Sequence, residues 1–196
     1  MLEDDPYGLV RFEGKPPPTV FELARGQNVV YSSSFSKTVA PGLRVGYLVL
    51  PNALAGRVVA AATASYITPA LLSQAIVYEF LRSGSFEPNL ERINGLLRER
   101  RDAMIAALER HLPEATWTVP EGGLLRLARP PGRDRVRRPA RAKGSRSSPA
   151  SDFFCGPGGE SALRLAFSYE SPSAIEEGVR RLASAVRAAI VLSRAA

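Results

Sequence analysis

The stretch from Val29 to Leu50 constrains the fold of this chain more than any other. Two apolar, β-branched runs, Val29–Tyr31 and Val45–Leu50, flank a polar loop. The runs predict two buried strands, and Pro41-Gly42 predicts a turn between them. The loop also carries Lys37, one of only three lysines in the sequence. A lysine held between buried strands is costly unless its ammonium is paired or its pKa is lowered.

The polar side chains of this loop match the chemical groups of one cofactor. A lysine with a lowered pKa can bind an aldehyde as an imine. Ser34 and Ser36 offer hydroxyls, and Arg44 offers a forked, permanently charged guanidinium that suits a phosphate dianion. An aldehyde and a phosphate in one molecule indicate pyridoxal 5'-phosphate. The alternative for Lys37 alone is a solvated lysine at a strand–loop–strand edge.

The composite pattern SFSKxxxPGxRxG, residues 34–46, is more specific than the lysine alone. It resembles the lysine segment of the fold-type I, class I/II aminotransferases. The resemblance implies that Lys37 is the catalytic lysine and carries the cofactor, and that Arg44, Ser34 and Ser36 hold the phosphate. It also implies an α/β fold. The C-terminal part of an aminotransferase large domain, a mixed sheet with helices, is then followed by a small α+β domain.

A second match begins at Asp4, where the sequence reads Asp-Asp-Pro-Tyr. By themselves these residues predict a turn. Beside the lysine segment they resemble the aminotransferase DxPY element. That resemblance implies that Asp4 faces the pyridine nitrogen of the cofactor and that the phenol of Tyr7 faces its O3′ oxygen. A carboxylate in that place keeps the ring protonated, and the protonated ring is the electron sink of the chemistry.

A third match lies in the alternating segment Ala162–Tyr169, which predicts a strand. Arg164 within it resembles the family arginine that binds the α-carboxylate of the substrate. A guanidinium matches a carboxylate bidentately and can thereby fix the amino acid over the cofactor. Without the resemblance, an exposed position on an edge strand explains Arg164 equally well.

Helical patterns set the expected domain boundary. The spacing of Leu72, Ile76 and Phe80 predicts a helix that ends near Gly84, and a longer pattern follows over residues 87–112. The resemblance assigns the first helix to the end of the large domain and the second to the small domain. We therefore predict a cofactor-binding part at residues 1–86 and a small C-terminal domain at residues 87–196. An amphipathic helix is predicted over residues 173–196.

Residues 124–151 depart from the family pattern. They hold nine basic side chains and one acidic side chain, so the formal net charge of this segment is +8. Because the net charge of the whole chain is +7, the remaining residues carry a net charge of −1. Few apolar side chains accompany these charges, and such a composition buries too little surface to offset chain entropy. We expect a disordered or frame-altered segment that contributes no core. A solvated insertion is an alternative; a nucleic-acid-binding arm is disfavoured because no aromatic residue is interleaved for stacking.

The resemblance implies pyridoxal-phosphate-dependent transamination of an amino acid to its 2-oxo acid, in an enzyme that is a homodimer when complete. It covers only the C-terminal half of a family member, so a non-catalytic aminotransferase-like fragment or pseudogene product is the alternative. A transcription regulator with such a domain would carry a winged helix-turn-helix ahead of it, which these residues lack. We expect no nucleic-acid, membrane or metal partner. A cytoplasmic location is the default, since no apolar run could cross a membrane and the single Cys155 fits a reducing compartment.

Overall fold

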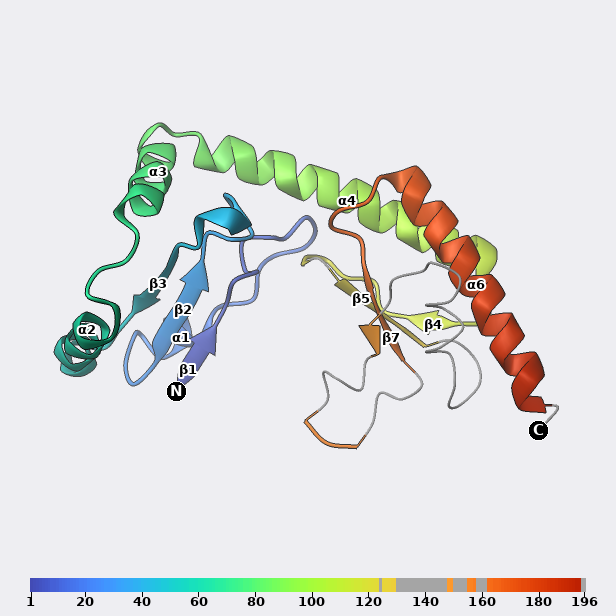
Figure 1. Ribbon diagram of the computed structural model, residues 1–196, viewed down its shortest axis with the longest axis horizontal. Helices are drawn as coiled ribbons and strands as arrows, with labels where there is room; N and C mark the ends of the chain where they lie inside the picture. The colour runs from blue at the N-terminus through green and yellow to red at the C-terminus, as the bar shows by residue number, and fades with distance from the viewer. Residues whose placement is uncertain (124, 130–147, 150–154, 158–161, 195–196) are drawn as a thin grey trace. The chain divides into compact units, whose positions relative to one another are not determined.

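The computed structural model describes residues 1–123, 125–129, 148–149, 155–157 and 162–194. The chain forms two compact units, Met1–Asn94 and Gly95–Ala196. Figure 1 shows that both include part of one long helix, α4, which runs from Phe86 to His111. The domain boundary predicted at residue 86 thus corresponds to the first residue of α4, and the division between the compact units falls farther along the same helix.

The first unit contains a mixed three-stranded sheet, as predicted. Its strands are β1 (Leu2–Asp4), β2 (Val30–Ser34) and β3 (Gly46–Val49), in the order β1-β2-β3. β1 runs parallel to β2, whereas β3 runs antiparallel to it. The short helix α1 (Val20–Leu23) lies in the connection from β1 to β2, and the 3-10 turn η1 (Pro41–Leu43) lies in the connection from β2 to β3.

The connection that carries α1 is attached to β1 by a side chain. The carboxylate of Glu3 accepts hydrogen bonds from the backbone nitrogens of Val20 (2.9 Å) and Phe21 (2.8 Å). Thr19 caps the same helix and forms a capping box with Glu22. The first N–H groups of a helix have no hydrogen-bond partner within the helix, and in α1 these side chains supply the partners.

The prediction that both strands flanking the lysine loop are buried is wrong for β3 and holds only in part for β2, whose residues are half-buried. Every residue of β3 is exposed, including Tyr47, Leu48 and Val49, each 40% exposed or more. The reason is that β3 is an edge strand of a three-stranded sheet. Two helices follow it, α2 (Asn52–Tyr66) and α3 (Leu71–Arg82), of which α2 has no buried residue and α3 has Val77 alone.

The second unit holds most of the buried apolar side chains among the described residues. Its antiparallel sheet has the order β4-β5-β7-β6. The bounds are β4 Thr116–Trp117, β5 Leu125–Arg129, β6 Ser148–Pro149 and β7 Leu163–Ala166. Helix α6 (Pro172–Arg194) corresponds to the amphipathic helix predicted near the C-terminus. The largest fully buried side chains of this unit come from α4, β7 and α6 and the residues beside them: Phe167, Leu108, Leu112, Leu182 and Val186.

The basic segment is where the structure differs from the predicted disorder. Residues 125–129 form β5, which pairs with β7 over Leu125↔Ala166 to Ala128↔Leu163. The sequence LRLAR alternates apolar and basic residues at Leu125–Leu127, and pairing with a neighbouring strand satisfies its backbone groups. Residues 148–149 form β6. The rest of the predicted disordered segment lies outside the described residues.

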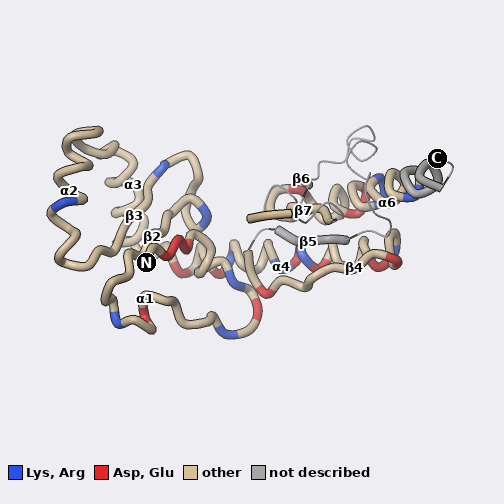
Figure 2. Tube along the Cα trace, turned by 90° about the horizontal axis from the view of Figure 1, so that it is seen from below, with Lys and Arg blue, Asp and Glu red and all other residues tan. Residues whose placement is uncertain are grey.

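Charged side chains of both signs cover the long helices of the second unit. Figure 2 shows Lys and Arg interspersed with Asp and Glu along α4 and α6. Arg180 and Arg181 both contact Glu177 within α6, and Glu176 joins α6 to α4 through Arg110 at 2.7 Å. In the part of the chain that the structure describes, no helix is long and apolar enough to cross a membrane.

Candidate active site

Lys37 lies in a tight loop directly after β2 and is half-buried. The backbone nitrogens of Val39 and Ala40 both donate to the carbonyl of Phe35, at 2.8 and 3.2 Å. Thr38 is buried at 4% exposure, and its carbonyl accepts a hydrogen bond of 2.8 Å from Asn89 Nδ2 in α4. Because the loop is closed on itself and tied to a helix, the backbone that carries Lys37 is well anchored.

Tyr7 is the predicted site residue that lies beside Lys37. The Lys37 Nζ atom is 5.6 Å from the centre of the Tyr7 ring. Tyr7 belongs to the turn after β1, which is closed by a 2.8 Å hydrogen bond from the nitrogen of Val10 to the Tyr7 carbonyl. Val10 is 1% exposed and anchors that turn. An ammonium at this distance from an aromatic ring gains a modest cation–π attraction.

Asp4 is the last residue of β1 and is exposed. In the parallel pairing of β1 with β2 it lies opposite Ser32. Side chains alternate along a strand, so Asp4, Ser32 and the half-buried Ser34 belong to the same face of the sheet. Parallel strands also end at the same edge. The pairing therefore brings the segment of Asp4 and Tyr7 next to the segment that leads to Lys37.

Arg44 and Ser36 contact each other across the β2–β3 connection. The Arg44 Nη1 atom lies 3.3 Å from Ser36 Oγ and 3.3 Å from the carbonyl oxygen of Pro41. The Arg44 backbone is left-handed, with φ 56° and ψ 36°, which is uncommon for a residue with a side chain. An exposed guanidinium and a hydroxyl thus lie together in the loop that carries Lys37 and can both donate to an anion.

Arg164 lies in the second unit, in β7, and is half-buried. β7 is an interior strand, since Arg164 pairs with Leu127 of β5 on one side and Ser148 of β6 on the other. Leu163 and Leu165 are buried. Arg164 is on the opposite face of the sheet from these two leucines.

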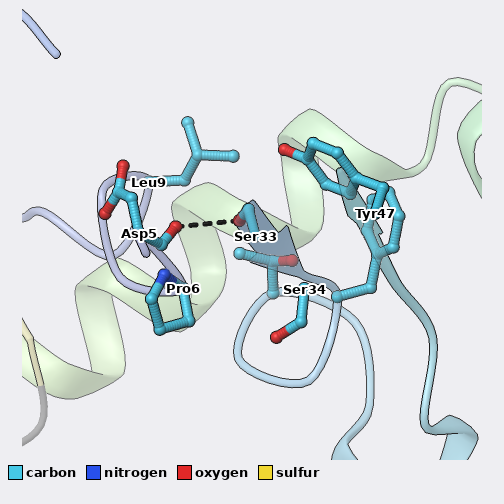
Figure 3. Close-up of a pocket in the computed structure, with 8 residues that line it drawn as sticks. Asp5, Pro6, Leu9, Ser33, Ser34 and Tyr47 are labelled. Carbon is cyan, nitrogen blue, oxygen red and sulfur yellow. Dashed lines mark hydrogen bonds between the residues drawn. The ribbon is translucent and has the colours of Figure 1, made fainter. Parts of the chain in front are cut away.

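A small pocket lies on the other face of the first sheet. Figure 3 shows Asp5, Pro6, Leu9, Ser33, Ser34 and Tyr47 around it, and Phe35 and Thr38 also contribute. Ser33 and Tyr47 are paired in register and project from the face opposite Asp4. Lys37, Tyr7 and Arg44 are not among the residues that line this pocket. Among the predicted site residues, Ser34 is the one that lines this pocket.

Asp5 and Tyr31 are polar residues of this second face that the sequence did not single out. The Tyr31 hydroxyl donates to Asp5 Oδ2 at 3.0 Å. Burial of the phenol and its contact with the Asp5 carboxylate raise the pKa of Tyr31 to about 12. From the sequence, Asp4 and Asp5 are neighbouring carboxylates that a turn explains equally well. Strand alternation is the signal that separates them, and it requires the exact end of β1, which the sequence does not give.

The comparisons with known proteins agree with this geometry. The family model for class I and II aminotransferases matches residues 2–182. A 2-aminoadipate transaminase from Thermus thermophilus is 38% identical over 200 residues, covering 98% of this chain and 50% of the relative. A rhizopine catabolism regulatory protein of Rhizobium meliloti, described as probable, is 34% identical over 194 residues, covering 94% of this chain and 38% of the relative.

Solved structures give the same result for the fold. The α-aminoadipate aminotransferase of Thermus thermophilus, complexed with N-(5'-phosphopyridoxyl)-L-leucine, superimposes with a TM-score of 0.89 at 35% identity, covering 97% of this chain and 51% of that one. The kynurenine aminotransferase of Pyrococcus horikoshii gives 0.88 at 32% identity, with 95% and 47% coverage. The predicted α/β aminotransferase fold is confirmed. The chain spans about half the length of the relatives it matches.

Proposed function

Because the chain belongs to the class I and II aminotransferase family, we propose that it serves the pyridoxal-phosphate-dependent transamination of an amino acid to its 2-oxo acid. The observation that carries this proposal is the placement of Lys37 beside Tyr7, in a loop that also joins Ser36 to Arg44. An amine, a phenol, a hydroxyl and a guanidinium are the donors that the cofactor's aldehyde, ring oxygen and phosphate require.

The residues fit the cofactor by the chemistry of their side chains. When bound, pyridoxal phosphate supplies an aldehyde and a protonated ring that accepts electron density. Lys37 would hold the aldehyde carbon through Nζ. Arg44, Ser34 and Ser36 would hold the phosphate. Asp4, exposed at the end of β1, would keep the proton on the ring nitrogen, and Tyr7 would donate to the ring oxygen.

Lys37 also has the role of moving the substrate's α-proton. Once released, the Lys37 amine would be the base that accepts the proton from the substrate α-carbon and the acid that gives it back. Its half-buried position in a loop tied down by Thr38 limits the directions from which Nζ can approach. The ring of Tyr7 lies 5.6 Å from Nζ and limits the space on that side of the amine.

Arg164 is proposed to bind the α-carboxylate of the amino acid. A bidentate guanidinium–carboxylate pair fixes both the position and the orientation of the α-carbon. An interior strand suits this task because both of its neighbours hold its backbone in place. The proposed substrate class is the amino acids. For the complete enzyme we propose a homodimer and a cytoplasmic location.

A non-catalytic role is the second candidate, and the similarity to a regulatory protein favours it. The two functions differ at one step. An enzyme removes the α-proton, whereas a binding module holds the cofactor and the amino acid without turnover.

Exchange of the α-proton separates the two candidates. The chain is incubated with pyridoxal phosphate and a set of α-deuterated amino acids, and loss of deuterium is followed by mass spectrometry. We expect exchange that Lys37→Ala abolishes. Cofactor absorbance without exchange would favour the binding module. Absence of any bound cofactor would contradict the proposed function itself.

A further inference from the structure

Asp5 is held by three consecutive residues of β2. Its backbone nitrogen donates to the Ser32 carbonyl at 2.8 Å, and its carbonyl accepts from Ser33 Oγ at 2.8 Å. Its side chain Oδ2 accepts from the Tyr31 hydroxyl at 3.0 Å. Figure 3 shows the contact between Asp5 and Ser33. Each polar group of one residue is thus bound to a different residue of the neighbouring strand.

These contacts occur on the face of the sheet opposite Asp4. Tyr31 and Ser33 alternate with Ser32 and Ser34 along β2, so they lie on the face away from the predicted cofactor contacts. Asp5 lies directly between Asp4 and the turn that carries Tyr7. Fixing Asp5 therefore fixes both neighbours without occupying the space in front of them.

The surroundings leave the Asp5 carboxylate little freedom. The Tyr31 ring packs between Phe21 and Tyr47, with ring centres 6.0 and 6.3 Å away. On the other side, a Cβ atom added at Gly8 would collide with Asp5 Oδ2. A glycine at this position thus makes room for the carboxylate, and the two aromatic rings hold the phenol that binds it.

We infer that Asp5 and Tyr31 are positioning residues that set the location of Tyr7 and Asp4 relative to Lys37. The inference deepens the proposed function, because the position of Tyr7 and Asp4 matters for catalysis only if Lys37 holds the cofactor. Neither Asp5 nor Tyr31 contacts the reacting atoms. They act through the turn, whose Tyr7 ring lies 5.6 Å from Lys37 Nζ.

The lysine signals provide a test that needs no cofactor. The full chain is produced with lysine labelled with carbon-13 at the ε-carbon and is studied by NMR. Its three lysines give three resonances. The Lys37 resonance is the one that is missing in Lys37→Arg. Because the Tyr7 ring lies 5.6 Å from Lys37 Nζ, we expect it to displace the Lys37 resonance. Tyr31→Phe removes one hydroxyl, and we expect it to move the Lys37 resonance and to leave Lys15 and Lys143 in place. Tyr47→Phe, which removes a hydroxyl from the same face and keeps the ring, should leave all three unchanged.

Two further variants separate positioning from loss of the fold. Asp5→Asn keeps an acceptor for the Tyr31 hydroxyl and should retain the Lys37 resonance, whereas Asp5→Ala should move it as Tyr31→Phe does. Gly8→Ala crowds the carboxylate from the other side and should have the same effect. A general loss of structure would instead shift all signals of the first unit toward unfolded positions. An unmoved Lys37 resonance in both Tyr31→Phe and Asp5→Ala would overturn the inference.

Cofactor binding gives the second readout. Loss of one hydrogen bond of this kind should weaken pyridoxal phosphate binding by about three- to tenfold. The pH midpoint of the visible absorption band should also shift in Tyr31→Phe and in Asp5→Ala. Asp5→Asn should keep the wild-type midpoint. If the wild-type chain binds no cofactor, the proposed function fails, and the lysine resonances still decide whether Asp5 and Tyr31 position the turn.

Discussion

The ammonium nitrogen of Lys37 lies 5.6 Å from the centre of the Tyr7 ring, although the two residues belong to segments that are distant in the sequence. The parallel pairing of β1 with β2 explains this proximity, because it brings the residues that follow both strands to the same edge of the sheet. The pairing of these two strands therefore assembles the candidate site of the first unit from two separate motifs.

Arg44 should contribute to holding the cofactor's phosphate. Charge-assisted hydrogen bonds contribute about 1.5–3 kcal/mol, so Arg44→Ala should weaken pyridoxal phosphate binding about 10- to 100-fold, measured by absorbance titration. Arg25→Ala is the matched control, since Arg25 is an exposed arginine of the same unit and also has a left-handed backbone, with φ 50°. Equal affinities in the two variants would show that Arg44 has no special role.

Arg164 should contribute to the affinity for the amino acid but not to the affinity for the cofactor. Loss of a charge-assisted bidentate pair costs about 2–4 kcal/mol, so Arg164→Ala should lower kcat/KM about 30- to 1,000-fold. Arg164→Lys keeps the charge but loses the fork and should recover only part of the loss. Kinetics are to be measured in the complete enzyme. Unchanged kinetics in Arg164→Ala would assign this arginine an ordinary place in β7.

Phe167 should be essential to the stability of the second unit. The side chain is fully buried, and Phe167→Ala should lower the free energy of unfolding by about 3–5 kcal/mol, measured by urea denaturation. Tyr169→Ala removes an aromatic ring from the same segment at a position that is 85% exposed, and it should change the stability by about 0.5 kcal/mol or less. Similar losses in both variants would contradict the assignment of the core to this region.

Tyr31 should make stability depend on pH under alkaline conditions. Its pKa is raised from its ordinary value of 10.0 to about 12 in the folded chain, so the folded state retains a proton that the unfolded state releases. The contribution is fully present below pH 10 and is lost as the pH rises to about 12. Absorbance titration of the tyrosines should show a phenol that ionises near pH 12 and is missing in Tyr31→Phe. Its persistence in that variant would assign the late phenol to another tyrosine.

The sequence was sufficient for local features that depend on residue type and spacing. The pattern around Lys37 predicted the strand–loop–strand unit, and the alternation in Ala162–Tyr169 predicted β7. It failed for β3, because burial depends on what covers a strand and not on how apolar the strand is. Residues 125–129 pair with β7 although their composition favours disorder, because a neighbouring strand can satisfy the backbone groups of such a segment.

The contact between Asp5 and Tyr31 could not be predicted for a similar reason. It depends on the register of β1 against β2 and on the exact residue where β1 ends. A shift of one residue would exchange the faces of Asp4 and Asp5. Composition and periodicity do not fix such a register in a strand as short as β1.

Borohydride reduction shows whether Lys37 binds pyridoxal phosphate covalently. The chain is mixed with the cofactor, reduced, digested and mapped by mass spectrometry, with Lys37→Ala as the control. We expect visible absorbance before reduction and a phosphopyridoxyl group on Lys37 afterwards, both lost in the variant. A label on Lys15 or Lys143 instead, or no label at all, would contradict it.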